Sequence, residues 1–248
     1  MEKESITLSK KPKGATVING FPGLGLVATI ATGFLYEHLK CEKIGKFFWP
    51  EPPATVALHS GKVVDPVSVY YNKKFNVVIV HSIMSPAGME FRTADLVMDV
   101  CKQVQAKELI SIEGVGSQEK TDAPEAFYFA SSKYATDRMR KIGVKSLSEG
   151  VIVGTTGALL LKAPEKMPMT SVFIETHSQM PDSKAAAKAV EVLDKYLGLD
   201  VPYEPLLKQA EQFESKLKGI MEQTQKTQQI KEQKTLITWD RKQLTTTS

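Results

Sequence analysis

Cysteine is nearly absent from this sequence, which contains only Cys41 and Cys101 among 248 residues. Two cysteines are too few for the disulfide framework of a small secreted protein, and no C-x-x-C spacing offers a zinc site. We therefore expect both thiols to be reduced. The four histidines are scattered without metal-ligand spacing, so we predict neither a metal nor another cofactor.

Long apolar runs and an excess of one charge are also lacking. No apolar stretch reaches the roughly 20 residues of a membrane-spanning helix, and the charged start, Met1 to Ser5, is unlike a signal peptide. The 32 basic and 28 acidic residues are interspersed and leave a net charge of +4, so no basic stripe marks a nucleic-acid partner. We expect a cytoplasmic protein that binds neither membranes nor nucleic acid.

The sequence motifs that most specifically indicate catalysis are missing as well. The chain has no G-x-S-x-G elbow and no G-x-x-x-x-G-K-[ST] loop. The best remaining cluster is His81, Glu113 and His177, each at or just past an expected strand end, where they could form a general acid and base pair. Polar residues at strand ends more often cap the backbone, which is the preferred interpretation. We predict that the protein is not an enzyme.

The sequence is organised around residues 15–40. Ala15 to Ile18 predicts a buried strand, GFPGLG at 20–25 a sharp turn, and Leu26 to Leu39 a helix. Gly23 and Gly25 also fit the G-x-G-x-x-A spacing, which lets a backbone approach a phosphate at a helix N-terminus. No convincing second βαβ unit follows, so close packing of helix and strand is preferred. The alternative is a nucleoside- or small-anion-handling enzyme that uses this glycine-loop crevice.

Further strands and helices are expected along the chain. Short β-rich runs between residues 43 and 71 have no helical stretch between them and should pair in antiparallel fashion. The remaining expected strands cover 75–81, 109–112, 127–130 and 171–176, and the helices 89–105, 133–142 and 182–197. The predicted fold is α/β, a mixed central sheet flanked by helices. Glycine loops at 20–25, 113–117 and 154–157 should gather along one sheet edge, where open sheets bind ligands.

The composition changes near residue 200. We expect an α/β domain over residues 1–200, a helical extension over 201–233 and a flexible tail over 234–248. Phe213 and Leu217 belong to an apolar stripe that either pairs with another copy of the chain or folds back on its own domain. Leu236, Ile237 and Trp239 interrupt the polar tail and are candidates for a partner contact.

Five short stretches, spread from residue 15 to about 217, together resemble the PAC2 family, the archaeal proteins similar to proteasome assembly chaperones. They are GFPGLGLV at 20–27, HSGKVVDP at 59–66, EGVG at 113–116, GTTGALL at 154–160 and PDSKAA at 181–186. The resemblance implies a phosphorylase-like or hydrolase-like α/β fold and assembly into homo-oligomers. It also implies help in assembling proteasome α-subunits into rings, with no established catalytic residue.

The sequence departs from the family pattern at its end. Some members finish in a hydrophobic-Tyr-X tripeptide that docks between α-subunits, whereas this sequence finishes in Thr245-Thr246-Thr247-Ser248. We therefore expect a contact with α-subunits to use another surface, for which Leu236, Ile237 and Trp239 are the candidates.

Overall fold

The computed structural model describes residues 5–49, 56–59, 61–85, 87–116, 123–163, 165, 167–176 and 180–203. The strands are β1 (Ser5–Leu8), β2 (Thr16–Gly20), β3 (Glu42–Phe48), β4 (Ala57–His59), β5 (Lys62–Val64), β6 (Val67–Asn72), β7 (Val77–Ser82), β8 (Glu108–Gly116), β9 (Ala126–Ala130), β10 (Lys145–Ser146) and β11 (Met169–Thr176). The helices are α1 (Val27–His38), α2 (Glu90–Gln103), α3 (Lys133–Lys141), α4 (Gly154–Lys162) and α5 (Ser183–Leu197), with a 3-10 turn, η1, at Leu24–Leu26.

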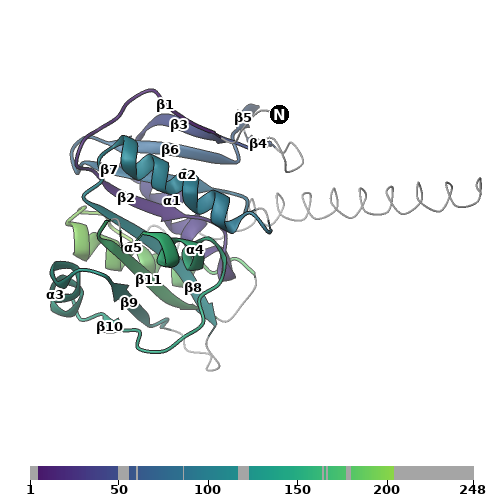
Figure 1. Cartoon of the computed structure of the whole chain (residues 1–248). Coiled ribbons are helices and arrows are strands. Elements are labelled where there is room, and N and C mark those ends of the chain that lie inside the picture. The colour runs from purple at the N-terminus through teal and green to yellow at the C-terminus, as the bar shows by residue number, and fades with distance from the viewer. Residues whose placement is uncertain are drawn as a thin grey trace, which may run out of the picture.

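A nine-stranded mixed sheet forms the centre of the molecule (Figure 1). Its strand order is β1-β3-β6-β7-β2-β8-β11-β9-β10, and β4 and β5 form a separate hairpin. Strands β7, β2, β8 and β11 run parallel, whereas β1, β3 and β6 pair in antiparallel fashion on one side and β9 pairs antiparallel with β11 on the other. The predicted mixed α/β sheet is confirmed, and so is the antiparallel pairing of the strands between residues 43 and 71.

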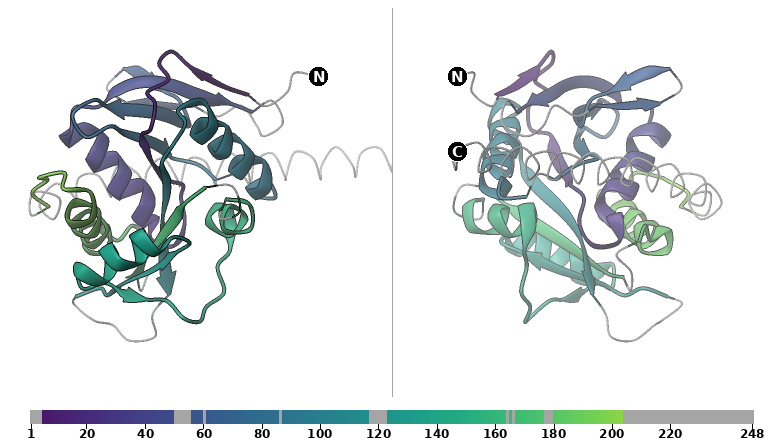
Figure 2. Two further views of the ribbon diagram at one scale, coloured as in Figure 1. Left: turned by 60° about the vertical axis from the view of Figure 1, so that its left-hand side comes forward. Right: turned by 90° about the vertical axis from the view of Figure 1, so that its right-hand side faces the viewer.

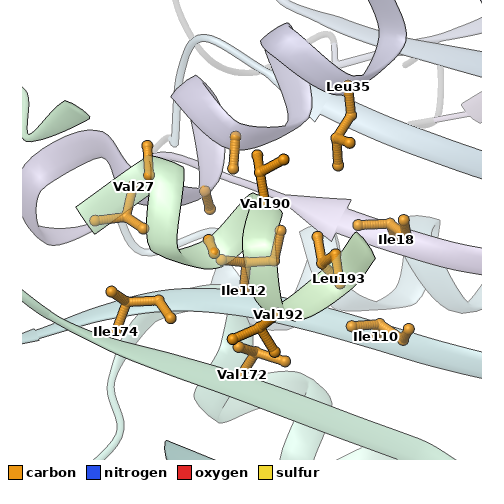
Figure 3. Packing of buried hydrophobic residues seen from close by; sticks show 14 of the residues in the cluster. Ile18, Val27, Leu35, Ile110, Ile112, Val172, Ile174, Val190, Val192 and Leu193 are labelled. Carbon is orange, nitrogen blue, oxygen red and sulfur yellow. The ribbon is translucent and has the colours of Figure 1, made fainter. Parts of the chain in front are cut away.

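Helices cover both faces of the sheet (Figure 2). Helices α1 and α5 lie side by side on one face, where their side chains meet those of β2, β8 and β11 (Figure 3). Helices α2 and α4 pack together on the other face against a second apolar cluster. The central strands are apolar on both faces because both faces are covered. Each fully buried Leu, Ile or Val contributes about 1.5–3 kcal/mol relative to an exposed one.

Local signals explain where α5 begins and ends. The Asp182 carboxylate accepts a hydrogen bond from the Ala185 backbone N–H at 2.9 Å and so caps α5. Gly198 ends the helix in the left-handed region, at φ 68°, which glycine adopts without steric cost. Just beyond it, Leu199 and Val201 are buried in the α1–α5 cluster, so the described core continues through residue 201.

The structure corrects two expectations from the sequence. Residues 113–116 are not a glycine loop but the last four residues of β8, paired with β11. Residues 154–157 are not a loop either but the first turn of α4, and Val151 and Val153, which precede them, are 91% and 74% exposed. Burial of Ala158 and Leu159 in the cluster beneath α4 explains why this segment is helical. In the described part of the chain, each helix is too short or too polar to span a bilayer.

Candidate functional site

The glycine loop after β2 packs directly on the carboxyl ends of β8 and β11. A methyl group at Gly23 would overlap the Glu113 carboxylate, and one at Gly114 would overlap the Leu24 carbonyl oxygen. At Gly25, where φ is +64°, a methyl group would come 2.5 Å from the Thr176 hydroxyl oxygen. The structure therefore brings Gly23, Gly25 and Glu113 together. Glycine is required because the protein's own side chains occupy the space beside the backbone.

Asp182 joins the same loop to the start of α5. Its backbone N–H donates to the Gly25 carbonyl oxygen at 2.9 Å, while its carboxylate accepts from the Thr176 hydroxyl at 2.8 Å. The same carboxylate caps α5. Asp182 thus connects the glycine loop through its backbone, and the end of β11 and the N-terminus of α5 through its side chain.

A chain of polar side chains leads from the sheet interior to Glu113. The Asn19 amide nitrogen donates to the Ser111 hydroxyl at 3.3 Å, and the Ser111 and Thr156 hydroxyl oxygens lie 2.9 Å apart. The Thr156 hydroxyl donates to Glu113 Oε2 at 2.8 Å. Because the Thr156 hydroxyl donates its one proton to Glu113, it accepts a hydrogen bond from Ser111. All the bonds of this chain therefore point towards the carboxylate.

Burial raises the pKa of Glu113 to about 7, although hydrogen bonds from the Thr156 hydroxyl and the Gly114 backbone favour the ionised form. Thr156 lies in the first turn of α4, the end of a helix that favours negative charge. Glu113 can consequently bind or release a proton near neutral pH. A carboxylate against Gly23 also repels a phosphate from the position that the G-x-G-x-x-A spacing suggests.

His81 lies on the opposite face of the sheet. It pairs with Gly20 of β2, and its Nδ1 lies 3.0 Å from the Thr32 hydroxyl oxygen of α1. Its ring packs edge-on against Tyr36, with ring centroids 5.1 Å apart. Burial lowers the pKa of His81 to about 4, so the ring is neutral at pH 7. With Glu113 bonded to α4 and His81 to α1, the sheet keeps the two apart, and they form no acid and base pair.

The other sequence candidates lie outside the described residues. These are His177, Phe213, Leu217, Leu236, Ile237 and Trp239. Within the described residues, no group of three or more His, Cys, Asp or Glu side chains could hold a metal ion. Both cysteines are free thiols, with Cys41 half-buried and Cys101 buried.

Asn19, Ser111, Thr156 and Asp182 were not singled out as site residues by the sequence. The signal that could have found Asn19 and Ser111 is a single polar residue inside each of two apolar runs, VING and LISI. Buried polar groups need partners, and these two side chains are bonded to each other.

Fold and site together define a mixed α/β protein whose glycine loop is packed onto the half-buried carboxylate of its own Glu113. The PAC2 family model matches residues 17–221, and the chain belongs to the PAC2 family. An uncharacterised protein of Methanocaldococcus jannaschii is 30% identical over 210 residues, which cover 84% of this chain and 85% of that protein.

Two solved structures from Pyrococcus furiosus extend the comparison. PbaA, described as an archaeal homolog of proteasome-assembly chaperone, is 32% identical with a TM-score of 0.81, over 91% of this chain and 99% of PbaA. PbaB, described as an archaeal proteasome activator, shares the fold with a TM-score of 0.75 at 23% identity, over 89% of this chain and 100% of PbaB.

Proposed function

We propose that this protein is a non-catalytic assembly factor that binds proteasome α-subunits and promotes their assembly into rings, acting as a homo-oligomer. The observation that carries the proposal is the similarity to PbaA, at 32% identity over 91% of this chain. The relation covers almost the whole described fold, so it is not confined to a generic α/β core.

The geometry of the site supports a non-catalytic role. Glu113 is bonded to the Thr156 hydroxyl, while neutral His81 lies on the other face of the sheet and is bonded to Thr32. A general acid and base pair needs both groups within reach of one substrate atom. The space beside Gly23 and Gly25 is occupied by the side chains of Glu113 and Thr176. The loop therefore acts as a packing element in this proposal.

We place the contacts of this proposal in two segments outside the described residues. Self-association uses the apolar stripe that includes Phe213 and Leu217, and the α-subunit contact uses Leu236, Ile237 and Trp239. A tryptophan with two aliphatic neighbours in the sequence has the composition of an interface anchor.

The test measures the binding of purified α-subunits from the source organism and the yield of α-rings by native mass spectrometry. We expect the full chain to bind and to raise the ring yield. Trp239→Ala and a truncation after Gln233 should weaken binding about tenfold or more, in line with the loss of an interface anchor. Tyr134→Ala, which removes a 65% exposed aromatic from α3, is the matched control and should bind normally.

Each part of the proposal can fail separately. If the full chain neither binds α-subunits nor changes the ring yield, the assembly function is wrong. If the full chain and both tail variants bind α-subunits with equal affinity, the proposed function stands but the tail does not contribute to binding. The double variant Phe213→Glu with Leu217→Glu tests the stripe by light scattering. If its assembly mass equals that of the parent chain, the stripe does not mediate self-association.

A further inference from the structure

A basic hollow lies at the end of the sheet opposite the glycine loop. It has a volume of about 690 Å³ and is lined by residues 10–12 after β1, residues 40 and 42 after α1, and residues 71–74 at the β6–β7 turn. That turn precedes Val77, which pairs with Thr16 at the start of β2, whereas the glycine loop follows Gly20 at its end. The hollow is therefore separate from Glu113.

Two asparagine side chains hold the three segments together. The Asn72 amide donates to the Leu39 carbonyl oxygen at 2.8 Å and accepts from the Phe75 backbone N–H at 3.1 Å, which joins the β6–β7 turn to the end of α1. The Asn76 amide donates to the Lys13 carbonyl oxygen at 3.1 Å, which joins the turn to the segment after β1. These bonds fix the backbone from which the lysines project without using a lysine side chain.

The lining of the hollow is strongly basic. It contains five lysines and one glutamate, which are Lys10, Lys11, Lys40, Lys73, Lys74 and Glu42. This local excess of four positive charges equals the net charge of the whole chain, +4. Like charges collected on one surface repel one another and attract a ligand of opposite sign.

The described residues leave most of this charge without a counter-charge. Lys10 pairs with Glu42 at 2.6 Å, and the Lys74 ammonium lies 4.6 Å from the centre of the Phe75 ring. Among the described residues, Lys11, Lys40 and Lys73 form no ion pair. Three ammonium groups from three segments thus face one hollow without a counter-charge.

We propose that this hollow binds an acidic peptide segment of a partner protein. An arginine would hold one carboxylate or phosphate in a planar fork, whereas lysines are point charges on flexible stems, and five of them in three segments suit several carboxylates spaced along a peptide. Among the described lining residues Tyr71 is the one aromatic, and its hydroxyl donates to the Asn76 side chain at 3.2 Å, whereas single-stranded nucleic acid stacks on a series of aromatic rings. The proposal does not rest on the proposed function.

The test uses the full chain and a fluorescein-labelled octaglutamate peptide, with binding followed by fluorescence anisotropy at low salt. We expect saturable binding that weakens as salt is added. Lys11→Gln with Lys73→Gln should lower the affinity about tenfold, because two exposed charge contacts are lost. Arg140→Gln with Lys141→Gln changes the net charge equally on α3, which packs beside β9 and β10 on the far side of the sheet, and should lower the affinity less than twofold.

Circular dichroism and urea unfolding would show that both double variants fold like the parent chain. Equal losses of affinity in the two double variants would overturn the proposal, because binding would then depend on the net charge of the chain and not on the hollow. An unlabelled octaglutamine peptide that competes as well as octaglutamate would overturn it too. Tighter binding of tripolyphosphate or of an eight-nucleotide oligothymidylate, lost in the Lys11 and Lys73 variant, would assign the hollow to a phosphate ligand.

Discussion

At the scale of single residues, Glu113 should make stability fall as pH rises. Its pKa is raised from 4.5 to about 7 in the folded chain, so the folded state holds the proton more tightly than the unfolded state. Its contribution to stability is complete below about pH 4.5 and is lost as pH rises through 7. Between pH 5 and pH 8 the parent chain should lose about 2 kcal/mol relative to Glu113→Gln.

Urea unfolding of both chains at pH 5 and pH 8 measures this difference, from which effects common to both chains cancel. Glu149→Gln, at an exposed position after β10, is the control and should follow the parent chain at both pH values. Parallel pH dependences for the parent and Glu113→Gln would contradict the placement of the half-buried Glu113 carboxyl against Gly23.

His81 should change stability with pH in the opposite direction to Glu113. Its folded pKa is lowered from 6.5 to about 4, so the unfolded state binds the proton more tightly. The contribution of neutral His81 is complete above about pH 6.5 and is lost as pH falls towards 4. We expect the parent chain to lose about 2 kcal/mol between pH 7 and pH 4.5 relative to His81→Phe, which keeps a ring beside Tyr36.

The same urea titrations test His81, with the exposed His38 on α1 as its control. His38→Gln should leave the acid limb of the stability curve unchanged. If His81→Phe leaves it unchanged as well, protonation of His81 does not accompany unfolding and its burial against α1 is contradicted.

At the scale of elements, the contact between the glycine loop and β8 can be measured as a coupling energy. Gly23→Ala should cost about 1–3 kcal/mol, because the new methyl group overlaps the Glu113 carboxylate. In a Glu113→Ala background the same change should cost much less, since its obstacle is gone. The coupling in this double-mutant cycle should reach about 1 kcal/mol or more, as for residues in contact.

Gly150→Ala is the matched control for that cycle. A methyl group there would lie in ordinary contact, 3.5 Å from a Leu147 methyl carbon, so its cost should be small and equal in both backgrounds. Additive costs for Gly23→Ala and Glu113→Ala would show that the loop does not rest on the carboxylate.

The elements themselves were largely predictable from local chemistry. The strand-turn-helix unit at 15–40 and the helix between Asp182 and Gly198 follow from apolar runs, a capping carboxylate and a left-handed glycine. β1 and the short β10 were not predicted, because strands at a sheet margin take their pairing from a neighbouring strand rather than from an apolar run of their own.

The site was predictable only in part, for a physical reason. Sequence placed His81 and Glu113 at strand ends, but the face that each occupies depends on the register between strands. His81 pairs with Gly20, while Ser111, two residues before Glu113, pairs with Asn19. A shift of one residue exchanges the faces of a strand, and neither strand carries that register in its own sequence.

At the scale of the whole molecule, the domain prediction leads to a truncation test. Within the described residues, which end at Tyr203, both apolar clusters already form a continuous core from Ile6 onward. A chain that ends after Tyr203 should therefore unfold cooperatively, with a free energy of unfolding within about 0.5 kcal/mol of the full chain.

Urea unfolding followed by tryptophan fluorescence and circular dichroism compares the two chains, with Trp49 as a reporter present in both. Loss of more than about 2 kcal/mol, or a smaller slope with urea, would mean that residues 204–248 complete the domain. The domain boundary proposed near residue 200 would then be wrong.

The margins of the nine-stranded sheet bear on solubility. Unpaired backbone donors and acceptors at the edge of a sheet are a template for other strands, and long, flat, apolar edges promote aggregation. Within the described residues the sheet ends at β1, which has four residues, and at β10, which has two and begins with Lys145. Edges this short offer few hydrogen bonds to an incoming strand. Copies of the chain at high concentration should therefore resist pairing of their sheet edges, so that association is left to side-chain surfaces.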